Sequence, residues 1–162
     1  MLPITSVLAI AALACVVAGM VTDLVRFEIP DGLSIALLVL ATAYGLLTPG
    51  FGWLSHVGAV ALVFGAGLFI FSRGWMGGGD IKLLTGIAAW TGLEGLVMQL
   101  TATALAGGGL AIVLMMARGI FGTIGTEPEQ IPKLFRRDSP LPYAVAIALG
   151  TCWWARSAWP IG

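Results

Sequence analysis

The stretch that decides the fold is "IKLLTGIAAWTGLEGLVMQLTATALAGGGLAIVLMMA", residues 81–117. A helix needs about 20 apolar residues to cross roughly 30 Å of bilayer hydrocarbon, so this stretch is too long for one ordinary crossing. Inside it, "TGLEG" (Thr91–Gly95) has the composition of a turn. The stretch therefore crosses a membrane once with an unusually long helix, or twice with a turn at Thr91–Gly95.

The composition of the whole chain is that of a protein whose solvent is mostly lipid. The 162 residues are 59% hydrophobic and only 10% charged, with a mean hydropathy of +1.00. Average soluble proteins carry about 25% charged residues, and this chain lacks the polar side chains to cover a surface in water. We predict one integral-membrane domain over residues 1–162, with no separate soluble module.

Four further apolar runs flank the central stretch. Leu8–Val17 has the apolar character of a signal peptide, but no Lys or Arg precedes Arg26, so we expect the first run to be a retained transmembrane helix. The runs are Leu2–Thr22, Leu33–Leu47, Val57–Ser72 and about Leu141–Trp159.

The basic residues decide between one and two central crossings. Membrane proteins keep Lys and Arg on the cytoplasmic side. With two crossings, seven basic residues share one side, and the opposite loops, Thr48–His56 and Thr91–Gly95, carry none; these seven are Arg26, Arg73, Lys82, Arg118, Lys133, Arg136 and Arg137. A single crossing would divide them between the two faces. We therefore predict an all-α polytopic protein with about six transmembrane helices, both termini outside and a cytoplasmic loop at about residues 118–140.

Several kinds of site and partner are disfavoured by the sequence. The formal net charge is zero, so we expect no nucleic-acid partner. Cys15 and Cys152 lie in apolar runs without a CxxC motif, which predicts neither a disulfide framework nor a zinc site. The only histidine, His56, falls in the loop opposite the basic side, which excludes a Ser-His-Asp triad or a multi-histidine metal site. We expect no metal and no cofactor.

Two aspartates fall on the same predicted cytoplasmic face. Asp23 follows the first apolar run, and Asp80 ends the glycine-rich part of "WMGGGDIKLL" (residues 75–84). Acidic residues in membrane segments are rare and are usually functional. The glycines at 77–79 permit positive φ and close approach by another chain, so an extended peptide fits beside Asp80.

Each aspartate alone also has an ordinary structural explanation. An aspartate after a glycine loop makes a good helix N-cap, and Asp23 can mark the water boundary of the first helix. Because the distribution of basic residues independently brings both to one face, we favour a carboxylate pair. Two carboxyl groups about 3 Å apart do not both ionise readily, so the ionised one can activate water while the protonated one polarises a carbonyl. This chemistry is that of an aspartyl protease.

Three segments resemble a known family. "DLVRFEIPDG" (Asp23–Gly32), "MGGGDIKLL" (Met76–Leu84) and, more weakly, "SPLPYAVAIA" (Ser139–Ala148) are similar to the type IV prepilin peptidases, membrane aspartyl proteases of the GxGD type. With the predicted layout of six helices, the resemblance covers nearly the whole chain. It implies that Asp23 and Asp80 are the catalytic pair.

The resemblance also implies a set of loop-shaping or substrate-binding residues. Lys82 matches a lysine common two places after the second aspartate, although it can equally be an interfacial anchor. Asp31 stands where the family usually has an asparagine, and an ionised aspartate only accepts hydrogen bonds, which alters the turn. The set comprises Gly77, Gly78, Gly79, Lys82, Pro30 and Asp31.

The chain lacks the paired CxxC motifs of the longer, N-methylating prepilin peptidases, so it resembles the short TadV/CpaA-like branch that serves Flp-type pili. This implies a bacterial inner-membrane enzyme that cuts prepilins and pseudopilins after a glycine at the cytoplasmic face, without methylation. Its expected partners are these substrates and the lipid bilayer, and the oligomeric state stays open.

Other functions stay open at this point. Intramembrane acidic pairs also occur in transporters, so a small transporter or a non-enzymatic pilus-assembly scaffold is an alternative. A GxGD protease with a different substrate is another. The mixed apolar and basic segment "IPKLFRRD" (residues 131–138) is predicted to lie at the lipid headgroups.

Overall fold

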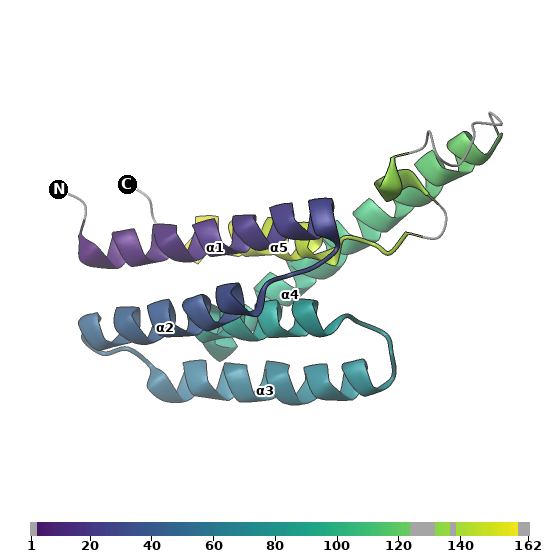
Figure 1. Cartoon of the computed structure of the whole chain (residues 1–162). Coiled ribbons are helices and arrows are strands. Elements are labelled where there is room, and N and C mark those ends of the chain that lie inside the picture. The colour runs from purple at the N-terminus through teal and green to yellow at the C-terminus, as the bar shows by residue number, and fades with distance from the viewer. Residues whose placement is uncertain (1–2, 124–131, 137–138, 159–162) are drawn as a thin grey trace.

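The protein is an all-helical bundle, as the sequence predicts. The computed structural model describes residues 3–123, 132–136 and 139–158 (Figure 1). Its elements are α1 (Ile4–Arg26), α2 (Asp31–Leu47), α3 (Trp53–Ser72), α4 (Gly78–Thr123), the short 3-10 helix η2 (Lys133–Phe135) and α5 (Tyr143–Ala158). Within this described part, three helices, α1, α3 and α4, are long and apolar enough to cross a membrane, and α2 is a shorter apolar helix.

Helix α4 consists of two helices that meet at Gly92. The backbone there has φ 59° and ψ −179°, a conformation that is essentially restricted to glycine. Beyond the break, the N–H of Leu93 donates to Ser55 Oγ at 3.0 Å, which fixes the turn beside the first residues of α3. The turn predicted within Thr91–Gly95 is therefore confirmed as a break in the helix.

After Gly92 the chain runs back toward the end of the bundle where α4 began. Thr103 and Ala104 line the same groove as Ile70 near the end of α3, and Gly107 lies against the ring of Tyr143. Figure 1 shows α1 beginning and α5 ending at one end of the bundle, and the last turns of α4 projecting with η2 from the opposite end. The crossing of a membrane by about six helices stays a prediction.

Three predicted helix boundaries are wrong. Helix α4 continues to Thr123, so residues 118–123 of the predicted loop are helical. The first helix does not end at Thr22 but continues to Arg26. Asp23 does not mark a water boundary, because it is buried against α5 within the helix. Helix α3 begins at Trp53, so His56 lies in its first turn rather than in a loop.

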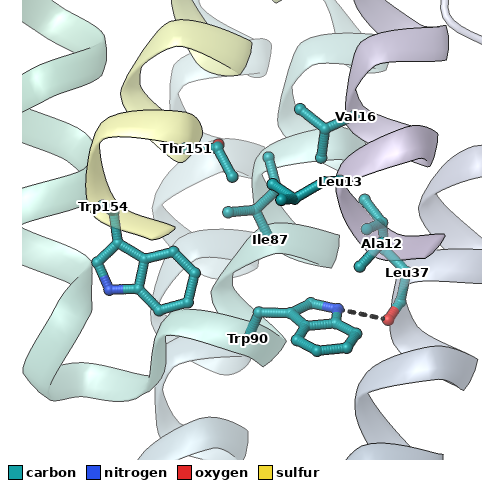
Figure 2. A pocket seen from close by; sticks show the side chains of 8 residues that line it. All are labelled: Ala12, Leu13, Val16, Leu37, Ile87, Trp90, Thr151 and Trp154. Atoms are coloured by element: carbon teal, nitrogen blue, oxygen red, sulfur yellow. Dashed lines mark hydrogen bonds between the residues drawn. The ribbon is translucent and has the colours of Figure 1, made fainter. Parts of the chain in front are cut away.

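The core between α1, α2, α4 and α5 is closely packed (Figure 2). Trp90 reaches across from α4 and donates its Nε1–H to the carbonyl oxygen of Leu37 at 3.0 Å. A cavity of only about 10 Å³ remains there, lined by Ala12, Leu13, Val16, Leu37, Ile87, Trp90, Thr151 and Trp154. This is about the space of one water molecule, so the middle of the bundle is a packed core and not a ligand site.

Candidate active site

Asp23 lies one turn before the end of α1 and is only 8% exposed. Its Oδ2 accepts a hydrogen bond of 3.0 Å from the backbone N–H of Ala144. Ala144 is in the first turn of α5, where backbone N–H groups have no partner within the helix and where negative charge is favoured. The buried carboxylate of Asp23 therefore caps α5 and joins the first helix to the last.

Asp80 is the third residue of α4, inside its first turn rather than before it as the sequence suggested. Its side chain is partly buried, and the backbone of Gly77 hydrogen-bonds to its carboxylate. Because Asp80 sits on the helix itself, the direction of its carboxylate is set by the start of α4.

The structure brings Asp23 and Asp80 to one cavity of about 500 Å³. The charge of Asp23 has an electrostatic effect on Asp80, as is expected of two carboxyl groups at one cavity. The volume is within the roughly 300–1,000 Å³ typical of ligand pockets, which is large enough for a short peptide segment. The remaining lining residues are Thr22, Arg26, Phe27, Glu28, Ile29, Pro30, Asp31, Gly77, Gly78 and Gly79.

The three glycines before Asp80 are not equivalent. A Cβ atom at Gly77 would stand 3.1 Å from Asp80 Oδ2, and one at Gly79 would stand 3.2 Å from Ile29 Cβ. At Gly78 the nearest atom, in the Phe71 ring, would be at an ordinary 3.5 Å. Space is therefore restricted at the first and third glycines and available at the second.

The turn between α1 and α2 closes the other side of the cavity. Phe27 ends α1 in the left-handed region with φ 55°, and its N–H donates to the Asp23 carbonyl oxygen at 2.9 Å. The chain then passes Ile29, which packs on Gly79, and Pro30, which precedes α2. Gly79 thus allows the Ile-Pro turn to lie directly on the loop that carries Asp80.

Asp31 and Lys82 form an ion pair that the sequence reasoning did not predict. Lys82 Nζ lies 2.8 Å and 2.9 Å from the two carboxylate oxygens of Asp31. Both side chains are more than half exposed, at 51% for Lys82 and 65% for Asp31, so the pair contributes little to stability. It links the first residue of α2 to the first turn of α4 beside the cavity.

Ala144 is the contact that sequence reasoning missed. Its contribution is a backbone N–H, which has no signature of its own in a sequence. The signal available was "SPLPYAVAIA", whose Pro142 precedes α5 and whose following residues begin that helix. A proline just before a helix indicates where its unpaired N–H groups start.

The rival sites considered from the sequence lie elsewhere or are not found. Within residues 3–123, 132–136 and 139–158, no group of three His, Cys, Asp or Glu side chains is placed to hold a metal ion. His56 stacks on Phe51 with 4.0 Å between ring centroids, and its Nδ1 is 2.9 Å from the Ala89 carbonyl oxygen. It is near Gly92 and does not line the aspartate cavity.

The segment predicted to lie at the headgroups is only partly described. Residues 131, 137 and 138 lie outside the described residues. Arg118 on α4 donates to the carbonyl oxygens of Leu134, at 3.0 Å, and Pro140, at 3.3 Å, and Phe121 packs on Phe135. These contacts hold the chain that leads into α5, whereas its contact with lipid stays a prediction.

A comparison with protein families gives one match. The model of the type IV leader peptidase family matches residues 9–112, which include Asp23 and the 77–80 loop but not Ala144. No curated protein and no solved structure is detectably similar to the chain.

Proposed function

Since this chain belongs to the type IV leader peptidase family, we propose that it is an aspartic endopeptidase that removes the leader of Flp-type prepilins and pseudopilins. Family membership indicates a peptidase. The observation that supports the aspartic type is the convergence of Asp23 and Asp80, from α1 and α4, on one cavity of about 500 Å³.

The proposed reaction uses the carboxylate pair and one water molecule. The ionised carboxylate takes a proton from the water molecule while the water oxygen attacks the carbon of the scissile carbonyl. The protonated carboxyl donates its proton to the carbonyl oxygen. The tetrahedral intermediate then collapses: the C–N bond breaks, the leaving nitrogen takes the proton that the first carboxyl gained from water, and the second carboxylate takes back a hydroxyl proton as the new carboxyl group forms. The hydrogen bond from Ala144 orients Asp23 throughout, since it uses one carboxylate oxygen and leaves the other available.

The charge of the cavity suits a basic leader. Besides the proposed catalytic pair, Glu28 and Asp31 line it. Arg26 also lines it and Lys82 pairs with Asp31, so the acidic groups still outnumber the basic ones.

The proposed location is the bacterial inner membrane, with the active site toward the cytoplasm and no N-methylation. Arg26 ends α1, Arg73 follows α3, Lys82 is in the first turn of α4 and Arg118 is near its far end. This gathering of basic residues at one end of the helices supports about six crossings with that end inside.

The direct test is co-expression with an epitope-tagged Flp-type prepilin. We expect wild type to give a leader-sized mobility shift that disappears in Asp23→Asn and Asp80→Asn at equal membrane levels. Glu94→Gln is the matched control, because it makes the same acid-to-amide change at an exposed site beyond the Gly92 turn. Full processing by either aspartate variant would contradict the proposal, and ion flux in liposomes without cleavage of any prepilin would favour the transporter alternative.

A further inference from the structure

A second hollow of about 210 Å³ lies between α3 and the second part of α4. Its walls include Ala66 and Ile70 on one side and Leu100 and Ala104 on the other. Among its lining residues only Thr103 and Tyr143 carry polar side chains, and Thr103 Oγ1 already accepts a hydrogen bond of 3.1 Å from Gln99. The groove therefore suits an apolar occupant.

The groove opens sideways, toward the lipid. The residues on its rim are exposed, including Leu62 at 57% and Leu100 at 37%, as are Ala66 and Ala104. Its floor, which includes Ile81 and Leu84 of α4, is buried. An apolar segment already in the bilayer can enter such a groove laterally, without passing through water.

One end of the groove adjoins the aspartate pair through three residues. Met76 precedes Gly77, Ile81 follows Asp80, and Tyr143 precedes Ala144, whose N–H holds Asp23. Asp80 is thus the chain neighbour of one lining residue, and Asp23 is hydrogen-bonded to the chain neighbour of another. The groove therefore adjoins, at these chain neighbours, the glycine loop and the helix ends that carry the pair.

We infer that this groove seats the apolar helix on the C-terminal side of the scissile bond; the inference rests on the proposed function. The α3 wall runs from Leu62 to Ile70, a rise of about 12 Å, which equals the length of roughly two turns of a helix that lies against it. The small side chains of Ala66 and Ala104 on its two walls let another backbone approach closely, as at helix contacts in membranes.

Cross-linking tests the occupant directly. In a Cys15→Ser/Cys152→Ser background, Ala66→Cys and Ala104→Cys are oxidised with prepilins that carry single cysteines along the apolar helix. We expect disulfides at one helical face of the substrate, repeating every three to four residues. Ala61→Cys is the matched control, since Ala61 is an exposed alanine of α3 outside the groove. Equal cross-linking at all three positions, or none at Ala66 and Ala104, would overturn the inference.

Kinetics separates this inference from the proposed function. Ala66→Phe and Ala104→Phe fill the groove and should lower kcat/KM for full-length prepilin at least tenfold. A soluble peptide that ends a few residues past the cleavage site should be cut at the wild-type rate, which also reports that the variants are folded. Gly67 is not a useful site, because it packs directly on Ile81.

Each kinetic outcome has a distinct meaning. If wild type cleaves neither substrate, the proposed function fails. If wild type cleaves both and the phenylalanine variants process full-length prepilin as well as Ala61→Phe does, the groove inference fails alone. Loss of co-purifying phospholipid without a change in the ratio of full-length to short-peptide cleavage would identify the occupant as a lipid acyl chain and overturn it as well.

Discussion

At the residue scale, the glycine loop shows how single side chains are excluded from the site. A Cβ atom at Gly77 or Gly79 would have to move Asp80 or Ile29, respectively. A Cβ atom at Gly78 would fit without moving its neighbours. The loop is therefore shaped by two contacts, one with the Asp80 carboxylate and one with the turn that contains Ile29.

This predicts a graded series of alanine variants. Gly77→Ala should displace the Asp80 carboxylate and Gly79→Ala should push the Ile29 turn away, so both should lose most prepilin cleavage at equal membrane levels. Gly78→Ala should keep it, because its Cβ makes an ordinary contact and alanine favours a helix by up to about 1 kcal/mol over glycine. Equal loss in all three variants would show that the loop is sensitive for another reason.

The hydrogen bond between Ala144 and Asp23 gives a second prediction. Ala144→Pro removes the N–H donor at a position in the first turn of α5, where proline is otherwise tolerated. We expect prepilin cleavage to fall at least tenfold. Ala144→Ser adds a side-chain atom but keeps the N–H, so it should retain much more activity; a result in which the two variants are equally active would remove Ala144 from the site.

At the element scale, sequence reasoning predicted where the helices lie better than where they end. The apolar runs could be found from their length, because a helix must match the thickness of a bilayer. The turn near Gly92 could be found from its glycines, because glycine permits the backbone to reverse direction. The end of α1 was wrong because a carboxylate in an apolar run looks like a water boundary. Asp23 is instead buried by α5, more than a hundred residues away in sequence.

The Gly92 turn predicts a loss of stability on substitution. Gly92→Ala would place a Cβ atom 2.9 Å from Ser55 Oγ in a backbone conformation that costs an alanine on the order of 1–3 kcal/mol. We expect a clear fall in the melting temperature in detergent. Gly65→Ala is the control, because Gly65 is helical and has no neighbour within 4 Å, and its melting temperature should stay the same or rise.

At the scale of the whole molecule, the charge distribution was the most informative part of the sequence. It predicted that Asp23 and Asp80 lie on the same side of the membrane, and the structure places them at one cavity. The pairing of Asp31 with Lys82, and of Asp23 with Ala144, could not be predicted, since these contacts depend on how helices distant in sequence pack.

The proposed topology predicts which loops face which compartment. Single cysteines at Thr48 and Gly50, in the cysteine-free background, should react with a membrane-impermeant maleimide added to intact spheroplasts. A cysteine at Arg73 should react only after the membrane is opened, because that end of α3 is proposed to be cytoplasmic. Labelling at Arg73 in intact spheroplasts would reverse the orientation and contradict a cytoplasmic active site.

The central claim is that Asp23 and Asp80 act as one unit, and a double-mutant comparison tests it most directly. Residues of one catalytic unit are strongly non-additive, so removing either should cost as much as removing both. With purified, reconstituted protein and one prepilin, we predict that Asp23→Asn, Asp80→Asn and the double variant share the same residual cleavage rate, orders of magnitude below wild type. A single variant that retains substantial activity, with the double variant falling by the product of the two effects, would contradict the account.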